Sequence, residues 1–234
     1  MNQDTTRRTA QRVAAAALAS AFTAIASAAT PGSAAPDIAA TDVTGKVVKL
    51  SDFRGKYVVL EWTNPECPFV QKHYDSKNMQ GLQKEWGAKE VVWLSVNSTR
   101  EGHSEYRTGP QMDAWMKEQG GTPRSVLIDG RSEAGRAYAA KTTPHMFVVD
   151  PKGNVVYAGA IDDKRSSNPA DVKTAKNYVR AALAEATAGR PVTVASTTPS
   201  GSRITFYVSV KELFPMRSQR RSTRTFSPVR IGLR

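Results

Sequence analysis

The sequence predicts an α/β fold, in which a mixed central β-sheet is flanked by helices on both faces. Runs of β-branched and aromatic residues alternate with segments of helical periodicity along most of the chain. Near the end of this pattern two β runs are joined by Pro151-Lys152-Gly153, which favours a tight hairpin turn. We therefore expect a sheet that ends in an antiparallel hairpin, with no internal repeats.

The predicted strands are short runs rich in β-branched or aromatic residues, which is typical of strands in a packed sheet. They span residues 46–50, 57–62, 91–96, 125–129, 145–150 and 154–158.

The predicted helices have apolar residues at helical spacing. They span residues 68–86, 111–119, 132–141 and 170–188. We expect the first to be interrupted at 75–78, where Ser76 is able to cap a second piece. Thr108 and Gln111 resemble a capping box that opens the second helix, and Gly189 closes the last.

The N-terminus predicts export. Three arginines precede residues 13–28, a run of small apolar residues that ends in Ala26-Ser27-Ala28, an A-x-A cleavage site. A membrane anchor is the alternative, but the run is shorter and richer in alanine than a spanning helix requires. We expect cleavage near Ala28, a periplasmic or secreted mature protein, and no integral membrane segment in the mature chain.

Beyond the signal, the length suits one domain. The net charge of +12 is distributed unevenly along the chain. Residues 208–234 contain seven basic residues and one glutamate and so carry +6 of it. The small remainder on the domain does not favour nucleic acid as a partner. The expected organisation is a signal peptide (1–28), a linker and first strand region (29–45), the domain (46–191) and a basic, partly disordered C-terminal extension (192–234). Within this extension 203–210 could form one strand, and we expect disorder from Phe214 onward.

The chain contains one cysteine, Cys67. It follows a predicted buried strand and precedes Pro68, a residue suited to the first position of a helix. Unpaired backbone N–H groups and the helix dipole at such a position favour the thiolate form of a cysteine. The sequence leaves three interpretations open: a reactive thiol, half of an intermolecular disulfide, or an inert buried residue.

Two blocks show a family resemblance. Residues 57–62 (YVVLEW) followed by 64–74 (NPECPFVQKHY), and residues 141–163 with their Thr-Thr-Pro-His run, resemble the redoxin or peroxiredoxin-like branch of the thioredoxin superfamily, of alkyl hydroperoxide reductase/thiol-specific antioxidant type. This resemblance covers residues 35–190 and implies a thioredoxin-like fold.

Carried over by position, the resemblance implies that Cys67 is the reactive residue and Glu61 a buried acid that handles protons. It also implies that Pro144 is a cis-proline, beside which Thr143 and His145 would help to bind substrate. Trp62 and Phe69 would line the same pocket. From the residues alone, Glu61 could instead pair with a lysine, and both aromatic residues could belong to the core.

The chain departs from the patterns of its relatives at several positions. Val70 stands where a C-x-x-C motif has its second cysteine, so ordinary dithiol reduction by this chain alone is excluded. Asn64, a candidate catalytic residue together with Cys67 and Glu61, stands where peroxiredoxins carry Thr or Ser, and in a rival alignment where the first cysteine would lie. Some relatives have a late cysteine after Pro-x-Gly, and here Ser202 follows Gly201.

The three histidines do not indicate a metal site, because one thiolate and one histidine do not make a structural zinc centre. We expect neither a metal nor another cofactor. The predicted function is an exported thiol oxidoreductase that takes a peroxide or disulfide substrate and is reduced by an external thiol or a redox partner protein, with a homodimer left open. The alternative is a non-catalytic binding module that uses the cis-proline groove.

Overall fold

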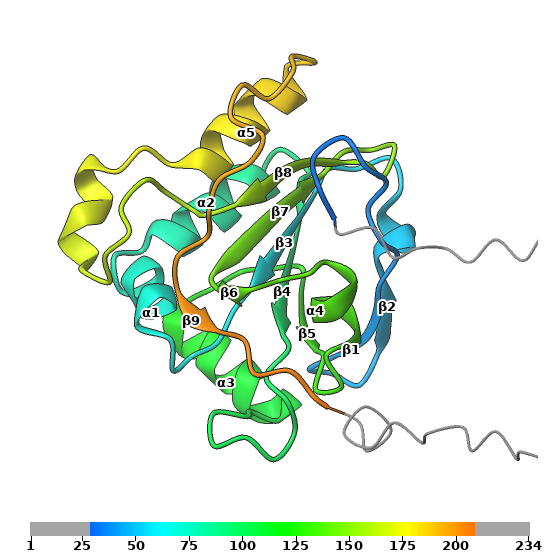
Figure 1. Cartoon of the computed structure of the whole chain (residues 1–234), viewed down its shortest axis with the longest axis vertical. Helices are drawn as coiled ribbons and strands as arrows, with labels where there is room; N and C mark the ends of the chain where they lie inside the picture. Colours follow the sequence, from blue (N-terminus) through cyan, green and yellow to red (C-terminus); the bar gives the residue numbers. More distant parts are fainter. Residues whose placement is uncertain (1–28, 209–234) are drawn as a thin grey trace, which may run out of the picture.

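The computed structural model describes residues 29–208, so the predicted signal peptide and residues 209–234 lie outside the described part. Its centre is a seven-stranded sheet with the order β2-β1-β5-β4-β3-β7-β8 (Figure 1). These strands are β1 (Ala39–Asp42), β2 (Val47–Lys49), β3 (Val58–Trp62), β4 (Val92–Asn97), β5 (Ser125–Ile128), β7 (His145–Val149) and β8 (Val155–Gly159).

The sheet is mixed, as the sequence predicts. Strands β3, β4 and β5 run parallel to one another, whereas β7 is antiparallel to both β3 and β8. The β7–β8 hairpin turns where expected, with Gly153 at φ 87° and its N–H bonded to the carbonyl of Asp150. The C-terminal ends of the parallel strands therefore meet at one edge of the sheet.

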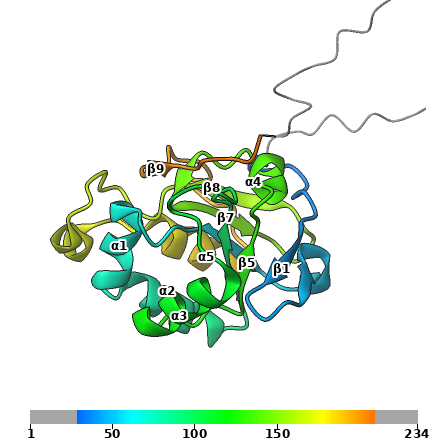
Figure 2. The same ribbon diagram turned by 90° about the horizontal axis from the view of Figure 1, so that it is seen from below.

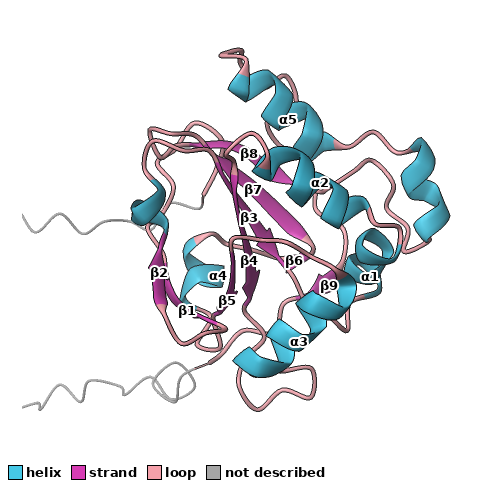
Figure 3. Cartoon of the chain, turned by 180° about the vertical axis from the view of Figure 1, so that it is seen from behind, coloured by secondary structure: helices cyan, strands magenta, loops and turns pink. Residues whose placement is uncertain are grey.

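Helices cover both faces unequally. Figure 3 shows α1, α2, α3 and α5 on one face, while α4 lies on the other. The helices are α1 (Pro68–Asp75), α2 (Asn78–Gly87), α3 (Gly109–Gln119), α4 (Glu133–Ala137) and α5 (Tyr178–Thr187), with 3-10 helices η1 (Leu50–Phe53) and η2 (Pro169–Thr174).

The core is divided by the sheet because successive side chains of a strand point to opposite faces. Leu60 and Trp62 of β3 belong to the cluster on the α4 side, whereas Val59 belongs to the cluster on the four-helix side. Cys67 lies in the second cluster. The candidate site residues of β3, Glu61 and Trp62, consequently point to opposite faces of the sheet.

The interruption predicted at 75–78 is present, but the expected cap is wrong. Ser76 ends α1, and Lys77 is the N-cap of α2 in the left-handed conformation at φ 61°. The capping box of Thr108 and Gln111 is confirmed, and Gln111 Oε1 accepts a bond of 2.9 Å from the backbone of Thr108.

Two predicted helices are shorter than expected. The helix predicted over 132–141 ends at Ala137, because Ala139 adopts a left-handed conformation at φ 48°. The helix predicted over 170–188 is two elements, since the side chain of Asn177 caps a new helix by accepting a 2.8 Å bond from the N–H of Arg180.

The C-terminal segment folds onto the domain. Strand β9 (Ser202–Arg203) pairs antiparallel with β6 (Thr142–Thr143), a two-residue strand that no sequence pattern predicts. In Figures 1 and 2 the orange segment descends from α5, passes β6 and continues past α4. The single strand considered for 203–210 is wrong within the described residues, where β9 ends at Arg203.

Candidate functional site around Cys67

Cys67 occupies the start of a helix, as the sequence predicts. It is the N-cap of α1, with Pro68 in the first turn. A turn precedes the helix, in which the N–H of Cys67 donates to the carbonyl of Asn64 over 3.1 Å. The local sequence therefore places the sulfur in the short connection between the end of β3 and the start of α1.

The thiol is enclosed by backbone groups. Cys67 Sγ lies 2.8 Å from the carbonyl oxygen of Thr143, to which it donates a hydrogen bond, and the Thr143–Pro144 peptide bond is cis. On another side, the N–H of Ser202 points to the sulfur from 3.5 Å. Cys67 is only 1% exposed. The two blocks of the resemblance thus meet at the sulfur, which is nevertheless covered.

Asn64 shapes the turn before the cysteine. Its Oδ1 accepts a bond of 3.0 Å from the N–H of Glu66, and its Nδ2 donates to Glu105 Oε2 over 2.7 Å. Glu66 in turn pairs with Arg107. Both polar groups of the Asn64 side chain are therefore hydrogen-bonded to residues other than Cys67.

Glu61 lies in a buried network of hydrogen bonds. Its oxygens accept bonds from Trp93 Nε1 at 2.7 Å, Tyr74 Oη at 2.9 Å and Ser95 Oγ at 3.1 Å. Burial raises the pKa of Glu61, and these bonds partly oppose that shift. These three partners are uncharged donors from α1 and β4. Within the described residues Glu61 is therefore not paired with a lysine, which was the alternative interpretation of this residue.

The two aromatic candidates lie in different places. Trp62 is fully buried, packs at about 5 Å against the rings of Tyr138 and Phe147, and donates from Nε1 to Ser98. Phe69 is half-buried on the four-helix side and lines a small cavity together with Pro144. The structure places Phe69 beside the cis-proline and Trp62 in the core of the opposite face.

The residues flanking Pro144 are both buried. Thr143 Oγ1 has no hydrogen-bond partner within residues 29–208. His145 Nδ1 accepts a hydrogen bond of 3.3 Å from the N–H of Lys141, and the centroids of the His145 and Phe147 rings lie 4.4 Å apart. Burial lowers the pKa of His145 to about 4, with a further contribution from Lys141, so the imidazole is neutral at pH 7.

A buried charged cluster near the cis-proline was missed by sequence reasoning. Lys72 Nζ lies 3.3 Å from both carboxylate oxygens of Asp162, and His73 Nε2 lies 3.9 Å from one of them. Burial and the charge of Lys72 lower the pKa of His73 to about 3. Lys72 and Asp162 fall in separate blocks of the resemblance, and no local pattern signals that they meet.

The described residues hold no cluster of three or more histidine, cysteine or acidic side chains suited to a metal ion. Across residues 29–208 no helix combines the length and apolarity needed to cross a bilayer.

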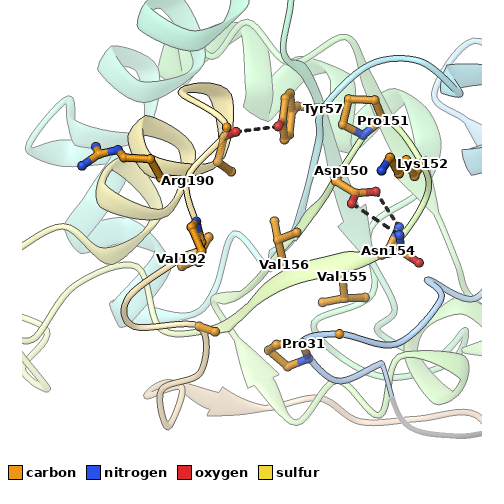
Figure 4. A pocket seen from close by; sticks show the side chains of 15 residues that line it. Pro31, Tyr57, Asp150, Pro151, Lys152, Asn154, Val155, Val156, Arg190 and Val192 are labelled. Atoms are coloured by element: carbon orange, nitrogen blue, oxygen red, sulfur yellow. Dashed lines mark hydrogen bonds between the residues drawn. The ribbon is translucent and has the colours of Figure 1, made fainter.

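A large cavity lies away from the cysteine. It has a volume of about 770 Å³ and is open to solvent beside the β7–β8 turn, the end of α5 and residues 189–195 (Figure 4). Tyr57, just before β3, donates to the carbonyl of Ala186 at its wall. Because Cys67 follows the other end of β3, this cavity is separated from the thiol by the length of the strand.

Comparison with known proteins identifies the family. Residues 31–158 match the AhpC/TSA family. A search of curated proteins finds no significant match.

Solved structures share the fold. An uncharacterized conserved protein from Geobacillus kaustophilus is 28% identical, with a TM-score of 0.67 over 77% of this chain and 94% of its own. A hypothetical protein from Sinorhizobium meliloti 1021 is 23% identical, with a TM-score of 0.65 over 78% of this chain and 98% of its own. The mixed sheet, the helix-start cysteine and the family match agree, and the chain belongs to the AhpC/TSA family with a thioredoxin-like fold.

Proposed function

We propose that this chain is an exported single-cysteine thiol oxidoreductase of peroxiredoxin-like type, which reduces peroxides or exchanges thiols through Cys67. The observation that carries the proposal is the position of Cys67 Sγ at the start of α1, 2.8 Å from the carbonyl oxygen that precedes Pro144. Backbone N–H groups at a helix start stabilise negative charge on an attacking sulfur. Membership of the AhpC/TSA family supports this assignment.

The proposed peroxide reaction needs only the one sulfur of this chain in its first step. The Cys67 thiolate attacks one peroxide oxygen, the S–O bond forms as the O–O bond breaks, and the other oxygen leaves as alcohol or water after taking a proton. Cys67 is thereby oxidised to a sulfenic acid. An external thiol then forms a disulfide with Cys67 and releases water, and a second external thiol regenerates the Cys67 thiol.

The external thiol is required because Val70, one helical turn along α1, cannot form a disulfide. A redox partner protein or a second copy of the chain would supply it equally well. We assign Glu61, held in its neutral network, and Asn64, which shapes the turn, to supporting roles around Cys67. Thr143, Pro144, His145 and Phe69 would contact the substrate, and Trp62 would support β3 from the opposite core.

One observation favours the alternative of a non-catalytic binding module. Cys67 is 1% exposed and packs within the apolar cluster of the four-helix face, which is also the environment of an inert cysteine. The groove beside Pro144 would then bind an extended polypeptide without any redox change.

Chemical labelling of the mature chain separates these functions. The protein would be treated with hydrogen peroxide and a dimedone-type trap for sulfenic acid, and labelling would be followed by mass spectrometry. We expect one adduct, on Cys67, that forms faster than the adduct of free cysteine and is absent from Cys67→Ser. Labelling no faster than free cysteine, both in the unaltered chain and in a variant whose C-terminal segment no longer covers the sulfur, would reject the peroxidase proposal. A mixed disulfide formed with a peptide disulfide would then support thiol exchange, and failure of both reactions would leave the binding module.

A further inference from the structure

The chain continues past α5 as an extended segment that is fastened at both ends. Upstream, the N–H of Ala158 in β8 donates to the carbonyl of Ala195 over 3.0 Å. Downstream, the carbonyl of Thr205 accepts a bond of 3.0 Å from the N–H of Arg100, and the N–H of Tyr207 donates to Ser132 Oγ over 2.9 Å. Residues 199–204, between these attachments, are called here the covering segment.

The covering segment lies directly on the site. In the β6–β9 pair, Ser202 is opposite Thr143, the residue whose carbonyl accepts the hydrogen bond of Cys67. The N–H of Ser202 lies 3.5 Å from Cys67 Sγ. One residue earlier, a Cβ added to Gly201 would lie 1.9 Å from the carbonyl oxygen of Thr143. The backbones approach so closely here that only glycine fits.

These contacts have the form of a peptide bound by strand addition. An extended polypeptide that pairs with a strand edge uses backbone hydrogen bonds for affinity, and its side chains add specificity. The edge of β6 offers such bonds, and the covering segment uses them: the N–H of Ile204 also donates to the carbonyl of Lys141 over 3.2 Å. A polypeptide approaching Cys67 beside Pro144 would need the same edge.

We propose that the covering segment is an internal occupant of the polypeptide-binding groove, which shields Cys67 until the segment detaches. The shielding follows from the contacts alone. The identification of the groove as a substrate site rests on the function proposed above. A partner protein would compete with the covering segment for β6, and the chain would be inhibited by its own C-terminal region.

The covering segment is held weakly enough to detach. Strand β9 contains only two residues, and most residues of the segment are half-buried or exposed. Ser200 Oγ is buried without a hydrogen-bond partner within the described part of the chain. Segments with few buried apolar contacts open locally at a lower free energy than global unfolding. Phe206, whose ring lies against Gly135 of α4, would keep the far end attached during opening.

The first test measures how fast Cys67 in the full mature chain reacts with N-ethylmaleimide. Gly201→Ala introduces a Cβ at the close approach, and Ile204→Pro removes the N–H that bonds Lys141. If detachment limits access, each variant should raise the alkylation rate by about tenfold, since a 1.4 kcal/mol change in the opening free energy gives that factor. The matched control is Gly81→Ala in α2, where an added Cβ meets no atom within 4 Å. Equal rates in all four proteins would overturn the proposal.

The second test captures the covered state. Cys67 is the only native cysteine, so Ser202→Cys provides a single new thiol whose backbone nitrogen lies 3.5 Å from Cys67 Sγ. With oxidised glutathione as oxidant, the two thiols should form one intramolecular disulfide and release two reduced glutathione molecules. Thr198→Cys, beside Lys141 and Thr142, is the control and should form a mixed disulfide with glutathione instead. Mixed disulfides in both variants would contradict the proposed occupancy.

The two proposals fail separately. Peroxide labelling of Gly201→Ala without any adduct, despite faster alkylation, would reject the peroxidase function and leave the covering segment established. Fast peroxide labelling of the unaltered chain, together with an alkylation rate that Gly201→Ala and Ile204→Pro leave unchanged, would reject the covering segment. It would leave the peroxidase function supported.

Discussion

The indole nitrogen of Trp93 donates a 2.7 Å hydrogen bond to Glu61 Oε2 from the neighbouring strand β4. Tyr74 and Ser95 also donate to this carboxyl group, which has no solvent exposure. The network joins β3 and β4 to the helix that begins at Cys67. A buried acid surrounded by donors of this kind contributes to the stability of the fold.

Glu61→Ala should lower the free energy of unfolding by about 3 kcal/mol or more, because it removes the acceptor of four buried donors, Trp93, Tyr74, Ser95 and Gln83. The measurement is chemical denaturation at pH 7. Glu66→Ala makes the same chemical change at a more exposed ion pair with Arg107 and should cost no more than about 1 kcal/mol. Equal losses in the two variants would contradict the structural role of the network.

His145 should make stability depend on pH. Its pKa falls from an ordinary value of 6.5 to about 4 in the folded protein, so between these values the unfolded chain binds a proton that the folded chain does not. Stability from neutral His145 is therefore complete above pH 6.5 and decreases as the pH falls toward 4, by up to about 1.4 kcal/mol per pH unit.

The comparison with His145→Gln isolates this effect. The stability lost through the substitution should be largest near pH 7 and shrink toward pH 4, as measured by urea denaturation at several pH values. Glu61, whose raised pKa acts in the opposite direction, is present in both proteins and cancels. A loss that does not vary with pH would show that His145 is not held neutral by burial.

The ion pair of Lys72 and Asp162 gives a third prediction. Both side chains are at most 4% exposed, so Lys72→Met leaves a buried carboxylate without its cation and should cost roughly 3–5 kcal/mol. The double variant Lys72→Met/Asp162→Leu removes both charges and should regain most of that loss. Thermal or chemical denaturation of the unaltered protein, Lys72→Met and the double variant measures these differences in stability. A double variant less stable than Lys72→Met would contradict this account.

Export gives a fourth prediction. When the full chain is produced in a Gram-negative bacterium, the exported protein should have the mass of residues 29–234. Replacing Arg7 and Arg8 by lysine distinguishes twin-arginine export from general secretion, because the change should block the first and leave the second intact. An unprocessed chain that stays with the cytoplasmic fraction would reject the signal peptide.

Local patterns in the sequence were sufficient for most of the elements. Pro68 and the capping box at Thr108 locate helix starts from residues only a few positions apart, and both are confirmed. The short strand β1 was only partly anticipated, because Ala39 and Ala40 carry little β-propensity and the strand exists through pairing with β2 and β5.

The sequence by itself determined that the one cysteine begins a helix after a buried strand, since a strand run, a turn and a proline are all adjacent to it. Only the tertiary structure decided what surrounds the sulfur. Thr143 and Ser202 reach Cys67 from 76 and 135 residues away, and Lys72 meets Asp162 across 90 residues. Periodicity and capping act over a few residues, whereas these contacts depend on sheet order and on where the chain returns after its last helix.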